Sequence, residues 1–238
     1  MTSDSNSPRS AIESARRTIA IERQAVEQLE HRIDDSFSKA VDLFASVEGR
    51  VIVSGMGKSG HIGNKIAATL ASTGTPAQFV HPAEACHGDM GMVTRADAAL
   101  LMSNSGTTSE ITALLPLLKR LGIPIVALTG NATSTLATAA NVHLNIGVSE
   151  EACPLDLAPT ASTTANLVMG DALAIALLEQ RGFTADDFAF THPGGALGRR
   201  LLTRVSDVLV TGSDVPRVTT DTSLADAVME ISAKGLGM

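Results

Sequence analysis

Residues 50–72, RVIVSGMGKSGHIGNKIAATLAS, constrain the fold more than any other stretch of the chain. A β-branched run at 51–53 leads into a glycine loop at 54–60, and apolar residues then recur at helical spacing from Ile62 to Leu70. This pattern predicts a strand, a tight turn and the start of a helix. Backbone N–H groups and the positive end of the helix dipole meet at such a turn, so the loop suits a phosphate or another anion.

Three kinds of phosphate loop match part of this stretch. A Walker A loop ends as residues 57–59 do, but it needs a glycine where Ile52 stands. The dinucleotide fingerprint G-x-G-x-x-G is met by the glycines at 55, 57 and 60. However, the next strand ends in His81-Pro82, where an acidic residue for a ribose hydroxyl is expected. The third kind is a sugar-phosphate loop, and the rest of the chain has to decide for or against it.

Composition narrows the class of protein. The chain has 238 residues, 44% of them hydrophobic, with a net charge of −7 and neither Trp nor Tyr. An acidic chain without these stacking aromatics is a poor nucleic-acid binder, so we expect no nucleic-acid partner. The two cysteines, Cys86 and Cys153, do not form a disulfide framework, and the N-terminus has no apolar signal region. We therefore expect a cytoplasmic protein that does not contact a membrane.

The N-terminal part predicts amphipathic helices. Residues 1–9 are polar and are expected to be a disordered tail. From 10 to 47, apolar residues recur at intervals of three and four, which predicts one long or two shorter helices. The apolar stripe either packs on the sheet of its own chain or covers a second subunit, and its length favours a homo-oligomer.

The pattern of strand, polar turn and helix then repeats. An apolar run at 98–102 ends in the polar turn 103–108, and further strands are expected at 123–128 and 142–146. Alternating strands and helices predict an α/β fold, a doubly wound parallel sheet of five strands. Ligands of such sheets bind beyond the carboxyl ends of the strands, so the turns at 54–60 and 103–108 are expected to face one ligand.

The C-terminal part begins with a long alanine-rich helix from Thr160 to Arg181, followed by Gly182. Residues 183–202 are expected to be a loop around His192, which Pro193 pushes into an extended conformation. A linker at 205–217 leads to a strand and helix at 218–238 whose apolar face lacks a partner. We expect the natural chain to continue beyond this fragment.

Five segments together carry a family resemblance: SGMGKSG, HGDMGM, SNSGTTSE, APTASTTANLVMGDALA and THPGGALGRRLL. In this order they closely resemble the arabinose 5-phosphate isomerases of the sugar isomerase (SIS) domain superfamily. The resemblance implies a flavodoxin-like SIS domain at 10–204, a truncated start of a CBS region at 218–238, and a tetramer. It also implies isomerisation of D-ribulose 5-phosphate and D-arabinose 5-phosphate through an enediolate, at the start of Kdo and lipopolysaccharide biosynthesis.

The resemblance also implies roles for individual residues. The expected substrate and phosphate site consists of Ser54, Gly57, Ser59, Ser103, Asn104, Ser105, Gly106, Thr107 and Thr108. The same Ser, Asn and Gly residues also occur in ordinary turns and helix caps.

The expected catalytic residues are Lys58, Glu110, His192, His87 and Glu151. Glu110 is the candidate base, although a capping box from Thr107 to Glu110 would account for it structurally. Lys58 steadies an oxyanion or is a solvated loop residue. His192 and His87 are candidates for proton transfer or ring opening, because the pKa of histidine lies near neutrality.

Aldose–ketose isomerisation by an enediol needs no metal, so we expect no cofactor and no required metal. The histidines at 61, 81, 87 and 192, with Cys86 and Glu84, are also open to interpretation as a metal site. Zinc at His87 or His192 would then be inhibitory. Two other functions remain open: an SIS isomerase for a hexulose 6-phosphate, and a non-catalytic phosphosugar-sensing domain.

Overall fold

The computed structural model describes residues 10–235; the tail expected at 1–9 lies outside them. The chain divides into two compact units, Met1–Phe188 and Ala189–Met238, and each is described by itself. The first unit holds the whole sheet.

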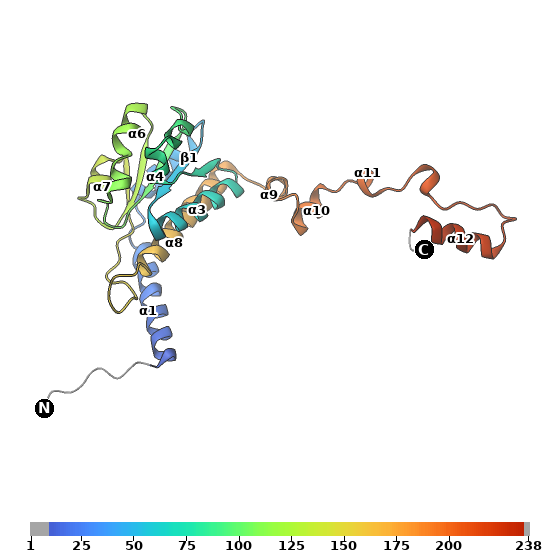
Figure 1. Cartoon of the computed structure of the whole chain (residues 1–238), viewed down its shortest axis with the longest axis horizontal. Helices are drawn as coiled ribbons and strands as arrows, with labels where there is room; N and C mark the ends of the chain where they lie inside the picture. The colour runs from blue at the N-terminus through green and yellow to red at the C-terminus, as the bar shows by residue number, and fades with distance from the viewer. Residues whose placement is uncertain (1–9, 236–238) are drawn as a thin grey trace. The chain divides into compact units, whose positions relative to one another are not determined.

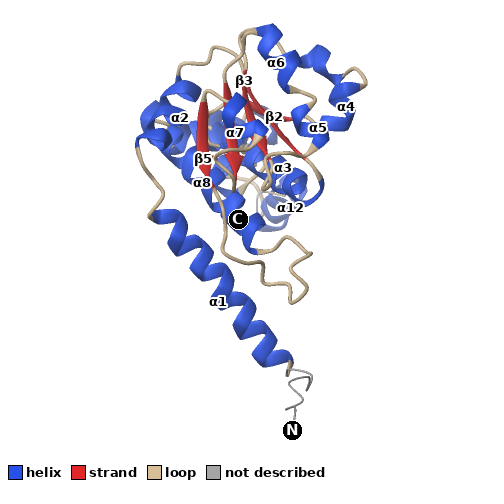
Figure 2. Cartoon of the chain, turned by 90° about the vertical axis from the view of Figure 1, so that its left-hand side faces the viewer, coloured by secondary structure: helices blue, strands red, loops and turns tan. Residues whose placement is uncertain are grey.

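The sheet has five parallel strands, as predicted (Figure 2). They are β1 (Val51–Gly55), β2 (Ala77–Phe79), β3 (Ala98–Met102), β4 (Ile125–Thr129) and β5 (Val142–Asn145). The spatial order is β2-β1-β3-β4-β5, so the chain turns back between β1 and β3. A ligand crevice is expected at this reversal, and the two polar turns of the sequence follow these two strands.

Helices cover both faces of the sheet (Figures 1 and 2). Side chains such as Val53 and Leu100 form one core with α2, α3 and α8. Side chains such as Ile52 and Leu101 form the other core with the shorter helices. The helices of the first core are α2 (Asp35–Ala45), α3 (Gly57–Ser72) and α8 (Ala161–Arg181). The second comprises α4 (Pro82–Cys86), η1 (Asp89–Met92), α5 (Ser109–Thr112), α6 (Leu115–Leu121) and α7 (Thr135–Ala139).

The N-terminal segment forms two helices, α1 (Ala11–Glu30) and α2, each with its own side-chain cap. The Ser10 hydroxyl accepts from the Glu13 amide, and the Glu13 carboxylate returns to the Ser10 amide. Only the second half of α1 buries apolar side chains, whereas Ile12 and Ile19 are 65% and 68% exposed. Helix α1 therefore extends beyond the layer that it packs against (Figure 2).

Helix α8 begins and ends as the sequence predicts, between the N-cap Thr160 and the left-handed Gly182. By length and composition it is the one helix among the described residues that is apolar enough to cross a membrane. Nine of its residues are buried in the molecule, and it runs beside α3 (Figure 1). These contacts are those of a core helix.

The segment after Gly182 differs from the expected loop. It contains α9 (Ala185–Thr191) and α10 (Ala196–Leu202), and the Thr-His-Pro-Gly-Gly sequence connects them. The Thr184 hydroxyl and the Asp187 carboxylate exchange hydrogen bonds with each other's amides. This capping pair starts a helix that the apolar pattern does not reveal.

Farther on, the second unit contains α11 (Val205–Val208), η2 (Gly212–Asp214) and α12 (Leu224–Lys234). The helix expected in this segment, with its start left open between Thr222 and Ser223, is formed with Ser223 as the cap, since the Ser223 hydroxyl accepts from the Asp226 amide. The strand expected at 218–220 is not formed. A short apolar run has no ladder to join here, because no described strand pairs with it. The bounds 10–204, 205–217 and 218–238, and the CBS assignment, stay predictions.

Candidate active site

The turn after β1 is formed by close packing of backbone on backbone. A Cβ added at Gly55 would lie 2.8 Å from the Ser59 carbonyl oxygen, and one at Gly60 would lie 2.6 Å from the Gly55 carbonyl oxygen. Gly57 starts α3 with a φ of +57°, a conformation that suits glycine. The first turn of α3, with Lys58 and Ser59, therefore lies at the carboxyl edge of the sheet.

Ser54 is the one buried polar side chain of β1. It is 1% exposed, and its Oγ has no hydrogen-bond partner among the described residues. Side chains alternate along a strand, so Ser54 lies on the opposite face from Val53, which packs in the core of α3 and α8. Ser54 is therefore a buried residue of the strand, and its role in phosphate binding stays a prediction.

The turn after β3 is tied together by its own polar groups. Ser103 Oγ accepts a hydrogen bond from the Gly106 amide at 3.0 Å and lies 2.8 Å from Thr108 Oγ1. Ser105 Oγ accepts from the Thr107 amide at 3.2 Å. The amides of Gly106 and Thr107, which were expected to face a phosphate, are thus donated within the turn. The Thr107 hydroxyl also donates to Ser105 Oγ, so the exposed side chains of Asn104 and Ser105 remain at the surface as donors.

Glu110 is not part of the capping box that the sequence allows. The N-cap of α5 is Thr108, one residue later than expected, and the Thr107 amide is already donated to Ser105 Oγ. The Ser109 hydroxyl donates to Glu110 Oε2 at 2.7 Å. This hydrogen bond, followed by one from its own amide, lowers the pKa of Glu110. The carboxylate is therefore ionised and accessible, as a general base requires.

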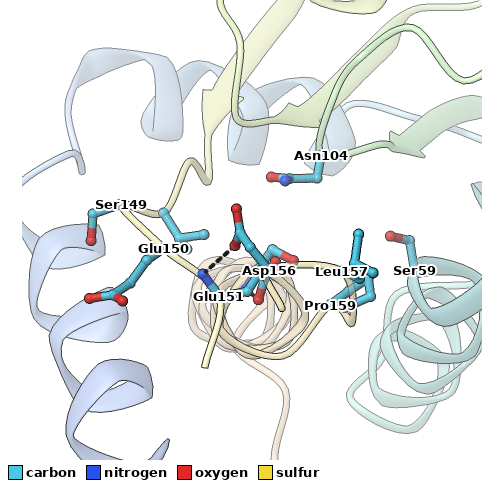
Figure 3. A pocket seen from close by; sticks show the side chains of 10 residues that line it. Ser59, Asn104, Ser149, Glu150, Glu151, Asp156, Leu157 and Pro159 are labelled. Carbon is cyan, nitrogen blue, oxygen red and sulfur yellow. Dashed lines mark hydrogen bonds between the residues drawn. The ribbon is translucent and has the colours of Figure 1, made fainter. Parts of the chain in front are cut away.

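A third loop completes the site. A cavity of about 340 Å³ lies between Ser59 of α3, Asn104 of the β3 turn and the loop after β5 (Figure 3). This volume is in the range of about 300–1,000 Å³ that small-molecule sites occupy. The loop residues that line the cavity are Val148, Ser149, Glu150, Glu151, Asp156, Leu157 and Pro159, with Ser162 at the start of α8. The cavity thus lies beyond the carboxyl ends of the strands, where the topology predicts a ligand.

Glu151 ties this loop to α8. Its Oε2 accepts hydrogen bonds from the Thr160 amide at 2.7 Å, the Thr160 hydroxyl at 2.9 Å and the Ser162 amide at 3.2 Å. Thr160 makes no side-chain cap bond itself, so Glu151 satisfies the first amides of α8 in its place. Burial raises the pKa of Glu151, but the hydrogen bonds from Ser162 and Thr160 together lower it below its ordinary value.

The lowered pKa of Glu151 gives a pH dependence with a defined sign. An acid whose pKa is lower in the folded state stabilises the fold above its unfolded pKa of about 4.3 and loses that effect as the pH falls through the folded pKa. We expect Glu151→Gln to lower Tm at neutral pH, and this difference from the parent chain to shrink below about pH 4. Thermal unfolding of both proteins across pH measures it. A difference that stayed constant with pH would contradict the capping role.

The lining of the cavity is electrostatically divided. Glu150, Glu151 and Asp156 line it from the third loop, whereas Ser59 and Asn104 line it from the first two (Figure 3). A phosphate is repelled by carboxylates and attracted by hydroxyl, amide and helix N-terminal donors. Sugar hydroxyls, by contrast, donate well to carboxylates. The cavity can therefore hold a phosphorylated polyol with its anionic end at the neutral loops.

Comparison with known proteins identifies the family of the chain. The SIS domain model matches residues 44–176, more than half of the chain. The chain belongs to the SIS domain family. The arabinose 5-phosphate isomerase KdsD of Pseudomonas aeruginosa PAO1 is 64% identical over 227 residues, which cover 95% of this chain and 70% of the relative. The enzyme of the same name from Escherichia coli K12 is 57% identical over 226 residues, covering 95% of this chain and 69% of the relative.

A solved structure shows the same fold. The E. coli CFT073 protein c3406, in complex with arabinose 5-phosphate, is 44% identical, with a TM-score of 0.74. The match covers 76% of this chain and 97% of that protein. The flavodoxin-like SIS fold expected from the sequence is confirmed.

Within this SIS domain, the predicted site residues fall into two groups. Ser59, Asn104 and Glu151 line one cavity, and the other residues of the two turns are their chain neighbours. Lys58 lies in the first turn of α3 and Glu110 in α5, directly after the turn 103–108, but neither lines the cavities described between residues 10 and 235. Their catalytic roles stay predictions.

The two candidate histidines, His87 and His192, belong to different compact units of the chain. His87 is the exposed C-cap residue of α4 in the first unit. His192 belongs to the second unit, where its Nδ1 lies 2.9 Å from Thr191 Oγ1. Among the described residues, no group of three or more His, Cys, Asp or Glu side chains is placed to hold a metal ion. Inhibitory zinc at His87 or His192 stays a prediction.

Seven lining residues were not among the predicted site residues: Val148, Ser149, Glu150, Asp156, Leu157, Pro159 and Ser162. Asp156 has a φ of +52°, and its Oδ1 accepts from the Glu151 amide at 3.2 Å. The loop from 148 to 157 has no regular secondary structure, so periodicity does not mark its side chains, whereas Pro159 and Ser162 lie within the family segment APTASTTANLVMGDALA. The helix start at Thr160, the family segment 158–174 and the candidate Glu151 are the signals in the sequence that point to this region.

Proposed function

We propose that this chain is an arabinose 5-phosphate isomerase that interconverts D-ribulose 5-phosphate and D-arabinose 5-phosphate. The observation that carries the proposal is the cavity at the β1–β3 reversal. Uncharged side chains that can donate hydrogen bonds to a phosphate line one side of it, and carboxylates line the other. The 64% identity to an arabinose 5-phosphate isomerase supports the same reaction. By the family resemblance, the product enters Kdo and lipopolysaccharide biosynthesis in the cytoplasm.

The reaction requires proton removal beside a carbonyl, stabilisation of the enediolate, and return of the proton one carbon along. Glu110 acts as the base, since its hydrogen bond from Ser109 keeps it ionised. Lys58, on the first turn of α3, stabilises the developing oxyanion. Glu151 orients the sugar hydroxyls from the third loop, and His192 or His87 transfers protons between oxygens or opens the ring. Binding of the remote phosphate holds the reacting carbons in place.

The proposal is tested by offering purified protein arabinose 5-phosphate, fructose 6-phosphate and glucosamine 6-phosphate and measuring ketose or aldose formation. We expect turnover of arabinose 5-phosphate with a kcat/KM at least about a hundredfold above that of the six-carbon compounds. Preference for fructose 6-phosphate would indicate a different SIS isomerase. Binding of a phosphosugar without turnover of any would indicate a sensing domain.

Ser105 provides a test of the phosphate cradle. Ser105→Ala removes an exposed hydroxyl at the end of β3, so we expect a loss of about 1.5–3 kcal/mol of substrate binding, the value of a hydrogen bond to a charged group. The loss should raise KM and leave kcat nearly unchanged, which steady-state kinetics measures. Ser46→Ala, at the exposed C-cap of α2, is the matched control. A fall in kcat alone would exclude a cradle role for Ser105.

We also propose that the chain forms a homo-oligomer, a tetramer by the family resemblance. The exposed Ile12 and Ile19 on the free half of α1 support this proposal. Helices with large exposed apolar side chains commonly pack against another subunit.

A further inference from the structure

We propose that Arg17 of α1 is a positioning residue that sets the place of Glu151 in the cavity. The proposal rests on the isomerase function proposed above. It concerns a residue far from the glycine turn, the phosphate turn and the third loop in sequence. Its basis is one continuous set of hydrogen bonds from α1 to the Glu151 carboxylate.

The first link crosses from α1 to the third loop. Arg17 Nη2 donates to the Ala152 carbonyl oxygen at 2.7 Å, across 135 positions of sequence. Ala152 directly follows Glu151 and is 3% exposed, so its peptide groups cannot turn to water for hydrogen bonds. Figure 1 shows this loop lying beside α1.

The next links run from Ala152 back to the carboxylate. The Ala152 amide donates to Thr160 Oγ1 at 2.8 Å, and the Thr160 hydroxyl donates to Glu151 Oε2 at 2.9 Å. The two peptide groups of Ala152 are therefore held by different side chains, the carbonyl by Arg17 and the amide by Thr160. Loss of the Arg17 contact frees the Ala152–Cys153 peptide, one residue from Glu151, so that Thr160 alone holds this part of the loop and the Glu151 carboxylate shifts with it.

The charges around Arg17 suit this role. Arg17 shares a second cavity of about 450 Å³ with Glu150, Glu151 and Asp156, and these three acids also line the first cavity. The loop 150–156 thus separates the two cavities, with the acids on it and Arg17 on one side. A guanidinium there offsets the repulsion among three carboxylates and holds several donors in a rigid fork.

Burial of Arg17 is energetically unfavourable in one respect, which a residue that only docks α1 would not need. Its Nε is buried and has no hydrogen-bond partner among the described residues. Helix α1 is fixed to α8 elsewhere, because the Thr164 hydroxyl donates to Glu22 Oε2 at 3.0 Å and Leu29 is buried. The Arg17 contact is thus not needed to dock the helix, and its main effect falls on the loop.

The test compares Arg17→Met, which keeps an apolar stem, with Arg16→Met, which removes the same charge from an exposed neighbouring position. We expect Arg17→Met to lower kcat by about ten- to hundredfold, the effect of displacing a reacting group by about 1 Å. KM should change by less than about threefold, because the phosphate turn is untouched. Arg16→Met should behave as the parent chain does. Arg17→Lys keeps the charge but lacks the planar guanidinium, so its kcat should lie between those of Arg17→Met and Arg16→Met. This variant replaces Arg17→Met in the test if Arg17→Met does not fold.

Two further readouts separate positioning from general damage. In the double variant with Glu151→Gln, Arg17→Met should cost almost nothing more, because both changes act through one carboxylate. Amide hydrogen exchange at Ala152, Thr160 and Ser162 should accelerate in Arg17→Met and not in Arg16→Met. Glu22→Gln, which weakens the hydrogen bond between α1 and α8, should leave kcat unchanged.

The outcomes distinguish this inference from the proposed function. Absence of turnover in the parent chain would overturn the proposed function. The amide exchange rates would still show whether Arg17 positions the loop that carries Glu151. Parental turnover, with additive kinetics and unchanged exchange in Arg17→Met, would overturn the positioning role and leave the function standing.

Discussion

Glu110→Gln is expected to lower kcat for arabinose 5-phosphate by about a hundredfold or more, the usual contribution of a general base. The amide keeps the size of the side chain and removes its ability to accept a proton. Because the structure forms no capping box between Thr107 and Glu110, a loss of helix stability does not account for such a change. Turnover with purified variant and parent measures it, and Glu48→Gln, an exposed carboxylate before β1, is the control.

Ser109→Ala refines the same test. The Ser109 hydroxyl is the largest contribution that lowers the pKa of Glu110, so its removal raises that pKa. A base is active only when deprotonated, and the acidic limb of the pH–rate profile should therefore shift to higher pH. Near-parental turnover of Glu110→Gln would show that the base lies elsewhere, with Glu151 the next candidate.

Gly106→Ala is expected to abolish most phosphate binding. Gly106 has a φ of +67°, and an added Cβ would overlap Ser134 Oγ and lie 2.5 Å from Ser134 Cβ. The left-handed conformation costs a residue with a Cβ about 1–2 kcal/mol, and the overlap adds about 1–3 kcal/mol. The turn at 103–108 must then open, and we expect KM to rise by roughly thirtyfold or more. Steady-state kinetics and titration with inorganic phosphate measure the loss.

Two variants separate strain from overlap in that prediction. Gly122→Ala also places a side chain at positive φ, +77°, but its Cβ would have nothing within 4 Å. It should lower Tm slightly and leave KM unchanged. Gly106→Ala combined with Ser134→Gly removes the overlapping atoms and should recover part of the binding. A parental KM for Gly106→Ala alone would show that the shape of this turn does not matter for the substrate.

The architecture follows from local pattern. Buried β-branched runs and helical spacing at 50–72 predict a parallel unit. The same pattern at 98–118 repeats it, and the structure has five parallel strands. The apolar, alanine-rich run and the glycine at 182 also predict the extent of α8. These features depend on neighbours within a few residues, which the sequence displays directly.

Local pattern misses features whose alternatives are close in energy. The segment 184–191 contains few apolar residues at regular spacing, yet the Thr184–Asp187 pair starts a helix there. A capping box from Thr107 to Glu110 fits the sequence, but Ser105 takes the Thr107 amide first. Ser105 and Glu110 compete for the Thr107 amide, and the shape of the turn decides which of them accepts from it. The residue types alone do not predict this outcome.

By itself, the sequence determined the parallel sheet, the two polar turns at its carboxyl edge, and a resemblance that points to a phosphosugar. Only the tertiary structure showed that a third loop closes the cavity, that Glu151 caps α8, and that Arg17 reaches this loop from the first helix. The reason is physical. The apolar pattern of a strand or helix is set by near neighbours in the sequence, whereas a cavity depends on groups far apart in the sequence that meet when the layers pack.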